Sequence, residues 1–193
     1  MRGRPSVFDS DSVILNAQEV FWKKGYSATS LQDLQAATKM GSGSLYNAFK
    51  GGKKELFLKA IRQRREDFHK FREELALSDA PIEKIKDFFR SLADSDTESH
   101  LKGCIIANSA TEMSYVDNDL EAEALQILKD VEEMFTEAIR KAQESGVIRN
   151  PASAKILGRH LITFWNGIHV TRRMYPERKE LSQLIEMQLD ILI

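Results

Sequence analysis

Apolar residues recur at intervals of three and four along almost the entire chain, which is the spacing of one face of an α-helix. The strict apolar and polar alternation that is typical of half-buried strands does not appear in the sequence. We therefore expect an all-α chain of about nine helices. The expected helices cover about residues 11–24, 30–38, 42–49, 53–75, 81–93, 103–116, 119–145, 151–175 and 178–192, with a loop at 94–100.

Charge is distributed unevenly along the 193 residues, although the net charge is only −1. Residues 1–72 contain 14 Lys and Arg against 7 Asp and Glu, whereas residues 73–193 contain 14 against 22. A basic first third can meet a polyanion such as nucleic acid, and an acidic remainder would be repelled by one. Chance segregation of solvated charge is the alternative explanation.

Several classes of protein are disfavoured by what the sequence lacks. It has no apolar run of about 18 residues and no apolar core of a secretory signal near its N-terminus, so we expect a cytoplasmic protein without a membrane span. Cys104 is the only cysteine, so no intrachain disulfide can form. No Walker-type loop, G-x-S-x-G or HExxH motif occurs, and His100 and Cys104 lack metal-binding spacing. We expect no enzyme activity, cofactor or metal site.

The stretch KMGSGSLYNAFK at residues 39–50 joins two short helices inside a three-helix unit, which is the helix-turn-helix arrangement. The second helix of this motif enters the major groove. Small residues at Gly41, Ser42 and Gly43 would let the backbone approach phosphates, and Ser44 and Asn47 can bond to base edges. Leu45 and Phe49 would hold the helix on the core. An ordinary amphipathic helix after a Gly/Ser turn is the alternative.

Residues 11–65 resemble the DNA-binding domain of the TetR/AcrR family of transcriptional repressors. The similar stretches are ILNAQEVFWKKGYSATSLQDLQAATKM, GSLYNAF and KKELF. The resemblance implies that Ser42, Ser44 and Asn47 face bases or nearby backbone and that Thr29, Tyr46 and Lys53 contact phosphates. Ser30, beside Thr29 at the start of the second helix, is included among the predicted DNA contacts.

Two departures from the family pattern lie close to this motif. Lys39 stands in the turn where the family often has Gly, and the linker 50–52 is one residue longer than is usual. The RGRP sequence before the first helix resembles an AT-hook core. Arg2 and Arg4 would contribute salt-dependent affinity for DNA, either as a disordered basic tail or by entering a narrow minor groove.

The sequence divides into a DNA-binding domain at residues 1–52, with a basic arm at 1–10, and an effector-binding and dimerisation domain at 53–193, with 53–75 as the connecting helix. The stretch KGCIIANSATE at 102–112 resembles a segment of one branch of the family. Polar groups scattered among aromatic ones suit a small-molecule site. The predicted effector contacts are Cys104, Asn108, Met113, His160, Phe164 and Trp165, although a buried core residue is the more common role for a cysteine such as Cys104.

Operator recognition usually requires two half-sites and therefore a symmetric dimer. The resemblance implies a four-helix bundle formed by the last two helices of each subunit. Its apolar candidates are Leu157, Leu161, Phe164, Ile168, Leu181, Leu184, Ile185 and Leu189, which could instead close the core of one subunit. We expect a repressor that a small-molecule effector releases from a palindromic operator. The alternatives are a regulator that senses oxidants or electrophiles through Cys104, and a helical ligand-binding adaptor without DNA binding.

Overall fold

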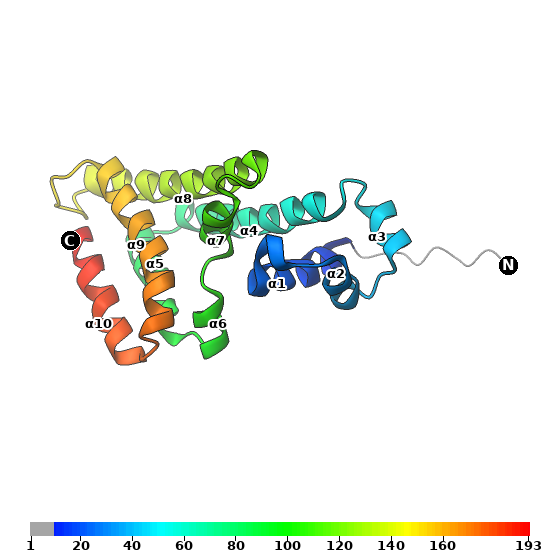
Figure 1. The fold of residues 1–193 in the computed structure, drawn as a ribbon. Helices are drawn as coiled ribbons and strands as arrows, with labels where there is room; N and C mark the ends of the chain where they lie inside the picture. The colour runs from blue at the N-terminus through cyan, green and yellow to red at the C-terminus, as the bar shows by residue number, and fades with distance from the viewer. Residues whose placement is uncertain (1–9) are drawn as a thin grey trace. The chain divides into compact units, whose positions relative to one another are not determined.

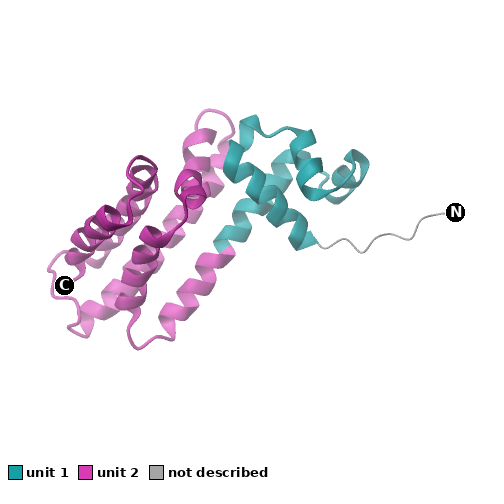
Figure 2. Cartoon of the chain, turned by 90° about the horizontal axis from the view of Figure 1, so that it is seen from below, with its two compact units in different colours: residues 1–65 teal, residues 66–193 magenta. Residues whose placement is uncertain are grey.

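The computed structural model describes residues 10–193, and helices joined by turns and loops make up this part of the chain, with no strand among them. The chain divides into two compact units, residues 1–65 and 66–193, which are coloured separately in Figure 2. The division falls within helix α4 (Gly52–Ala76), so that both units include part of this helix. The predicted all-α class is confirmed. A functional boundary between residues 52 and 53 stays a prediction.

Unit 1 contains α1 (Ser10–Ala28), α2 (Leu31–Thr38), α3 (Ser42–Ala48) and the first part of α4, all labelled in Figure 1. Gly25 has φ 80° and ψ 171°, so α1 is kinked at the residue where the sequence suggested that it would end. Aromatic rings form the core. The rings of Phe21 and Tyr26 each lie edge-on to Phe57, with centroid distances of 4.9 Å.

Unit 2 is built around a long helix that packs on two others. Helix α8 (Asn118–Glu144) contacts both α7 (Ile105–Met113) and α9 (Ala154–Met174). A Cβ at Gly158 of α9 would lie 2.2 Å from Thr136 Oγ1 and 3.1 Å from the Glu132 carbonyl oxygen, so only glycine allows this close approach of α8 and α9. The remaining elements are α5 (Pro81–Arg90), η1 (Ser91–Asp94), α6 (Thr97–Lys102), α10 (Arg178–Leu189) and η2 (Asp190–Leu192).

The loop predicted at residues 94–100 is partly wrong, because α6 occupies residues 97–102. Asp96 caps this helix, since its carboxylate accepts a hydrogen bond from the Ser99 backbone nitrogen at 2.7 Å. The helix that we expected at 103–116 accordingly begins later, at Ile105, and ends at Met113. A run of small polar residues hides α6 in the sequence because it contributes only one buried side chain, His100.

Aromatic side chains also fill the interior of unit 2. Trp165 stacks on Phe88 at a centroid distance of 4.9 Å, and Phe164 stacks on Phe89 at 5.3 Å. Most of the apolar residues that we assigned to a dimer interface are buried within this single chain and belong to its core: Leu157, Leu161, Phe164, Ile168, Leu181, Ile185 and Leu189. None of the helices in residues 10–193 is long and apolar enough to span a bilayer.

Candidate nucleic-acid interface and sensor region

Helix α3 separates its side chains into a buried pair and an exposed polar face. Leu45 and Phe49 are each 3% exposed, whereas Tyr46 is 51% exposed. The other exposed residues at this helix are Gly41, Ser42, Gly43, Ser44, Asn47 and Ala48. The structure therefore leaves Ser42, Ser44 and Asn47, the residues that we predicted to meet bases, exposed.

The glycines beside this surface have no role in packing. A Cβ added at Gly41 or Gly43 would meet no atom within 4 Å, and Gly41 has an ordinary φ of −71°. Gly43 lies inside a regular helix, where alanine is more stable than glycine. Nothing in the folded chain therefore requires glycine at either position. Close approach of this backbone to another molecule would require it.

A capping box fixes the start of α2, which precedes the turn into α3. The Ser30 hydroxyl accepts from the Asp33 nitrogen at 3.1 Å, and the Asp33 carboxylate accepts from the Ser30 nitrogen at 2.9 Å. Lys24 pairs with Asp33 at 2.6 Å and thereby ties α1 to α2. Lys24 and the Ser30 groups hold the pKa of the Asp33 carboxyl far below its usual range. Ser30 therefore has a clear structural role.

The turn between α2 and α3 is tight and strained. Lys39 ends α2 with φ 57° and ψ 29°, the left-handed conformation that glycine adopts most readily. This explains why the family pattern often has glycine at this place. Gln35 Nε2 of α2 donates to Ser42 Oγ at 2.5 Å, so that α2 orients the first side chain of α3. No signal in the sequence singled out Gln35.

Two residues predicted to contact phosphates are held by the start of α4. The Tyr46 ring lies against Gly52, where an added Cβ would be 3.3 Å from Tyr46 Cε1. Lys53 Nζ donates to the Thr29 carbonyl oxygen at 2.7 Å and lies 4.5 Å from the centroid of the Tyr26 ring. The linker that precedes Lys53 therefore still brings this ammonium to the α1–α2 turn.

Thr29 does not fit the phosphate contact that we predicted for it. The residue is 1% exposed, its hydroxyl donates to the Gly25 carbonyl oxygen at 2.6 Å, and its nitrogen donates to the Tyr26 oxygen. Thr29 stabilises the turn before α2 instead. Arg2 and Arg4, the predicted residues of the basic arm, lie outside the described residues.

The electrostatics of unit 1 suit a polyanion. Residues 1–65 contain 12 Lys and Arg against 5 Asp and Glu. Helix α3 itself carries no charged residue, and Lys39 and Lys50, which flank it, are exposed. Charge that surrounds a neutral polar helix supplies affinity for the phosphate backbone and leaves the helix to contact bases.

The predicted effector contacts in unit 2 do not form one open site. Cys104 and Met113 are buried, with 5% and 0% exposed, and Phe164 and Trp165 belong to the aromatic core. Asn108 is exposed and donates to the Lys102 carbonyl oxygen at 3.0 Å. His160 is half-buried, and its Nε2 has no hydrogen-bond partner among the described residues.

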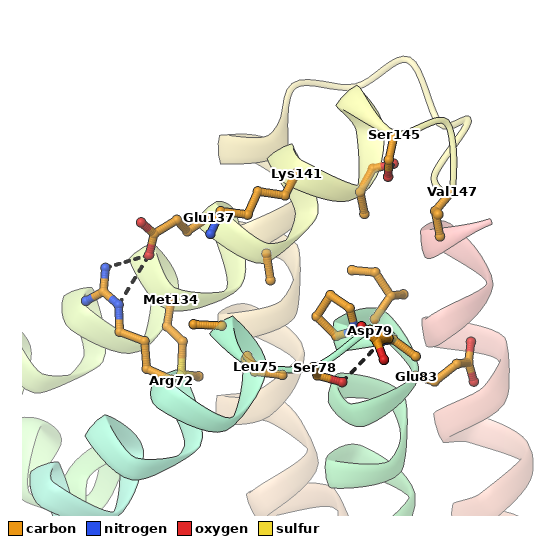
Figure 3. A pocket seen from close by; sticks show the side chains of 16 residues that line it. Arg72, Leu75, Ser78, Asp79, Glu83, Met134, Glu137, Lys141, Ser145 and Val147 are labelled. Atoms are coloured by element: carbon orange, nitrogen blue, oxygen red, sulfur yellow. Dashed lines mark hydrogen bonds and ion pairs between the residues drawn. The ribbon is translucent and has the colours of Figure 1, made fainter.

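A pocket of about 580 Å³ opens elsewhere in unit 2, between the end of α4, the start of α5 and the second half of α8. Leu75, Met134 and Ala138 line its apolar part, and Arg72 and Glu137 form an ion pair of 2.7 Å at its edge (Figure 3). None of the six predicted effector contacts lines this pocket. Its lining residues are common core and surface types, so no sequence pattern pointed to this pocket.

No group of three or more His, Cys, Asp and Glu in residues 10–193 is placed to hold a metal ion.

Comparison with known proteins decides the family. The model described as "Bacterial regulatory proteins, tetR family" matches residues 13–60, and the one described as "Tetracyclin repressor-like, C-terminal domain" matches residues 81–187, more than half of the chain. The chain belongs to the TetR family. It is a ligand-responsive DNA-binding transcriptional regulator, and members of the TetR family act as dimers.

Two curated proteins that resemble this TetR-family regulator are named as repressors. The HTH-type transcriptional repressor DhaR of Mycobacterium sp. (strain GP1) is 28% identical over 180 residues, which cover 91% of this chain and 87% of DhaR. The HTH-type transcriptional repressor ComR of Escherichia coli (strain K12) is 34% identical over 123 residues, which cover 62% of this chain and 58% of ComR.

Solved structures of TetR-family proteins have the same fold. A variant of the regulator CifR with three substituted cysteines, in complex with 26-bp double-strand operator DNA, is 25% identical with a TM-score of 0.81 and covers 99% of this chain and 100% of its own. Reduced E. coli NemR has a TM-score of 0.83 over 95% of this chain and 96% of its own, but it is only 14% identical and shows the fold alone.

Proposed function

We propose that this TetR-family regulator is a homodimeric repressor that binds a palindromic operator through α3 and is released by a small-molecule effector bound in unit 2. The observation that carries the proposal is the exposed, uncharged face of α3 with glycines that packing does not require. Ser42, Ser44 and Asn47 would contact bases, and Tyr46 and Lys53 would contact phosphates.

The same proposal assigns a role to the basic arm at residues 1–10 and a cellular location to the protein. Arg2 and Arg4 would add salt-dependent affinity, because each phosphate contact releases counterions. Operator DNA is the partner, so we propose that the regulator works in the cytoplasm. We propose no catalytic activity for it.

Selection of bound duplexes from a random pool, followed by footprinting, tests the DNA-binding part. We expect a palindrome whose half-sites are one or more helical turns apart. Asn47→Ala should weaken binding to the selected site by about 1–3 kcal/mol, as the loss of a bidentate base contact does. The matched control is Asn16→Ala, an exposed asparagine of α1, which should bind as tightly as the wild type. A well-folded protein that selects no duplex would instead support the adaptor alternative.

The dimer would use a different face of α9 and α10 from the residues that we first assigned to it. Ile156, Val170, Met174 and Met187 are between 55% and 63% exposed on these helices, with the small Thr163 and Gly167 also exposed along α9. Such a stripe allows the close approach of two helices.

A charged substitution tests whether this face of α9 and α10, and not another exposed apolar residue, forms the dimer. Val170→Glu should give a monomer in sedimentation velocity and weaken operator binding. Val116→Glu, equally exposed at 61% in the turn before α8, should remain dimeric. A dimeric Val170→Glu protein would contradict the assigned face.

A second candidate mechanism is release by oxidation or electrophilic modification of Cys104, which is a free cysteine. Cys104→Ser should keep operator binding and lose release by hydrogen peroxide or N-ethylmaleimide. Unchanged release in this variant would exclude the mechanism.

A further inference from the structure

Arg172 of α9 is the one buried arginine among the described residues, with 4% of its surface exposed. Its Nη2 donates to the Ser99 carbonyl oxygen of α6 at 2.8 Å, and its Nε has no hydrogen-bond partner among the described residues. A guanidinium has five N–H donors, so a single contact with a neutral carbonyl leaves most of its capacity unused.

Four arginines of unit 2 that are more exposed than Arg172 each pair with a carboxylate. The pairs are Arg72 with Glu137, Arg90 with Glu186, Arg159 with Glu132, and Arg178 with Asp94. In residues 10–193 no ion pair joins Arg172 to a carboxylate. Arg172 is therefore a buried cation without a counter-charge, and a buried charge without a partner is strongly unfavourable.

The groups around Arg172 do not neutralise it. His100 of α6 is 4% exposed, and its Nδ1 has no hydrogen-bond partner in the described part of the chain. Burial, and next the charge of Arg172, lower the pKa of His100. Asp96 also acts on His100, but it is exposed and caps α6. Cys104 and Arg173 are the titratable groups that act on Arg172 itself, and neither of the two supplies a permanent negative charge.

The same face of α9 continues from Arg172 into the aromatic core. Trp165, His169 and Arg172 are spaced four and three residues apart, so they lie on one side of the helix. The Trp165 and His169 rings meet edge-on at 4.2 Å, and Trp165 Nε1 has no hydrogen-bond partner among residues 10–193. Seven residues of helix span about 10 Å, the length of a small carboxylate with an apolar tail.

We propose that the effector is a small organic carboxylate, with its charged group on Arg172 beside His100 and Cys104 and its apolar part along Trp165 and Phe88. This rests on the proposed function, because it names the chemical class of the effector. A planar carboxylate matches the guanidinium better than other small anions do. The open pocket fits a carboxylate less well, because its Arg72 is already paired with Glu137.

The test compares each carboxylate with its uncharged amide on the full-length protein. We would titrate 4-phenylbutanoate against 4-phenylbutanamide, and hexanoate against hexanamide, by calorimetry. Trp22→Phe leaves Trp165 as the only tryptophan, so its fluorescence reports binding at this place. We expect each carboxylate to bind at least about tenfold more tightly than its amide, as charge-assisted hydrogen bonds exceed neutral ones.

Four variants then locate the preference for charge. Arg172→Gln should abolish it. Arg173→Gln, which removes a neighbouring exposed arginine that donates to the Lys102 carbonyl oxygen, should retain it, and so should Lys141→Gln in the open pocket. Arg172→Lys should retain part of the preference. The wild-type comparison remains decisive even if Arg172→Gln does not fold.

Two results would overturn this inference. In the first, the negative charge gives no advantage, because neither carboxylate binds or because each amide binds equally well. In the second, Lys141→Gln removes the preference for the carboxylate over the amide while Arg172→Gln keeps it. Gel shifts with the selected operator and no added carboxylate test the proposed function separately. A protein that binds operator but shows no preference for carboxylates would refute the effector class alone.

Discussion

Gly43→Ala should make the regulator more stable and at the same time a weaker DNA binder. Alanine is about 0.8–1.0 kcal/mol more favourable than glycine inside a helix. Gly43 is in the first turn of α3, and its added Cβ would meet no atom within 4 Å, so no steric term opposes the gain. We expect the free energy of unfolding to rise by roughly 0.5–1 kcal/mol. Thermal unfolding should then shift upward by about 1–4 °C in a chain of this length.

The effect on DNA binding should have the opposite sign. If the backbone of Gly43 lies against the duplex, a methyl group there forces the helix outward. Overpacking of a close contact costs about 1–3 kcal/mol, or roughly 5- to 150-fold in the dissociation constant. Fluorescence anisotropy with a labelled operator, at fixed salt, measures this change directly.

Asn16→Ala provides the comparison, because it also replaces a poor helix former on an exposed helix surface of unit 1. It should raise stability by a few tenths of a kcal/mol, about 0.5 at most, without any change in operator affinity. A Gly43→Ala protein that is more stable and binds operator normally would refute the reasoning, because glycine would then have no role at the interface.

Lys39→Gly should stabilise the protein by about 0.5 kcal/mol in chemical denaturation. The steric energy of a left-handed lysine, which the substitution removes, is larger than the free-energy cost of the extra entropy that glycine gives the unfolded chain. Gly158→Ala should lower the free energy of unfolding by about 1–3 kcal/mol, because its Cβ would overlap Thr136 Oγ1. Because the pKa of His100 is below its ordinary 6.5 in the folded state, the unfolded chain binds a proton first as the pH falls. Stability should therefore decline below about pH 6.5, and less steeply in His100→Gln; an equal decline in both proteins would exclude this origin.

Much of the DNA-binding unit could be predicted because its signals are local. The spacing of Leu45 and Phe49 identifies their buried side, and Ser30 with Asp33 identifies a helix start. Thr29 could not be assigned in this way, because only the folded turn shows that its hydroxyl is used by the Gly25 carbonyl oxygen.

Unit 2 was less predictable because its features depend on contacts between segments that are distant in the sequence. Arg172 and Ser99 are 73 residues apart, and Arg72 and Glu137 are 65 apart. Helical periodicity marked α9 and α10 as amphipathic but could not say whether an apolar face packs within one chain or against a second copy. The burial of Leu157, Leu161 and Leu181 within one chain answers this for the residues that we first chose.

Gly43 and Arg172 are two residues that the stability of the folded chain does not explain. A chain selected only for stability would have alanine at position 43, where nothing is in the way, and an apolar side chain at position 172, where a cation is buried without a counter-charge. Replacement of buried ionic groups by apolar ones is often neutral or stabilising. Arg172→Met should therefore leave the free energy of unfolding unchanged or higher while it removes carboxylate binding. A large loss of stability in this variant would show that the Ser99 contact alone accounts for the arginine.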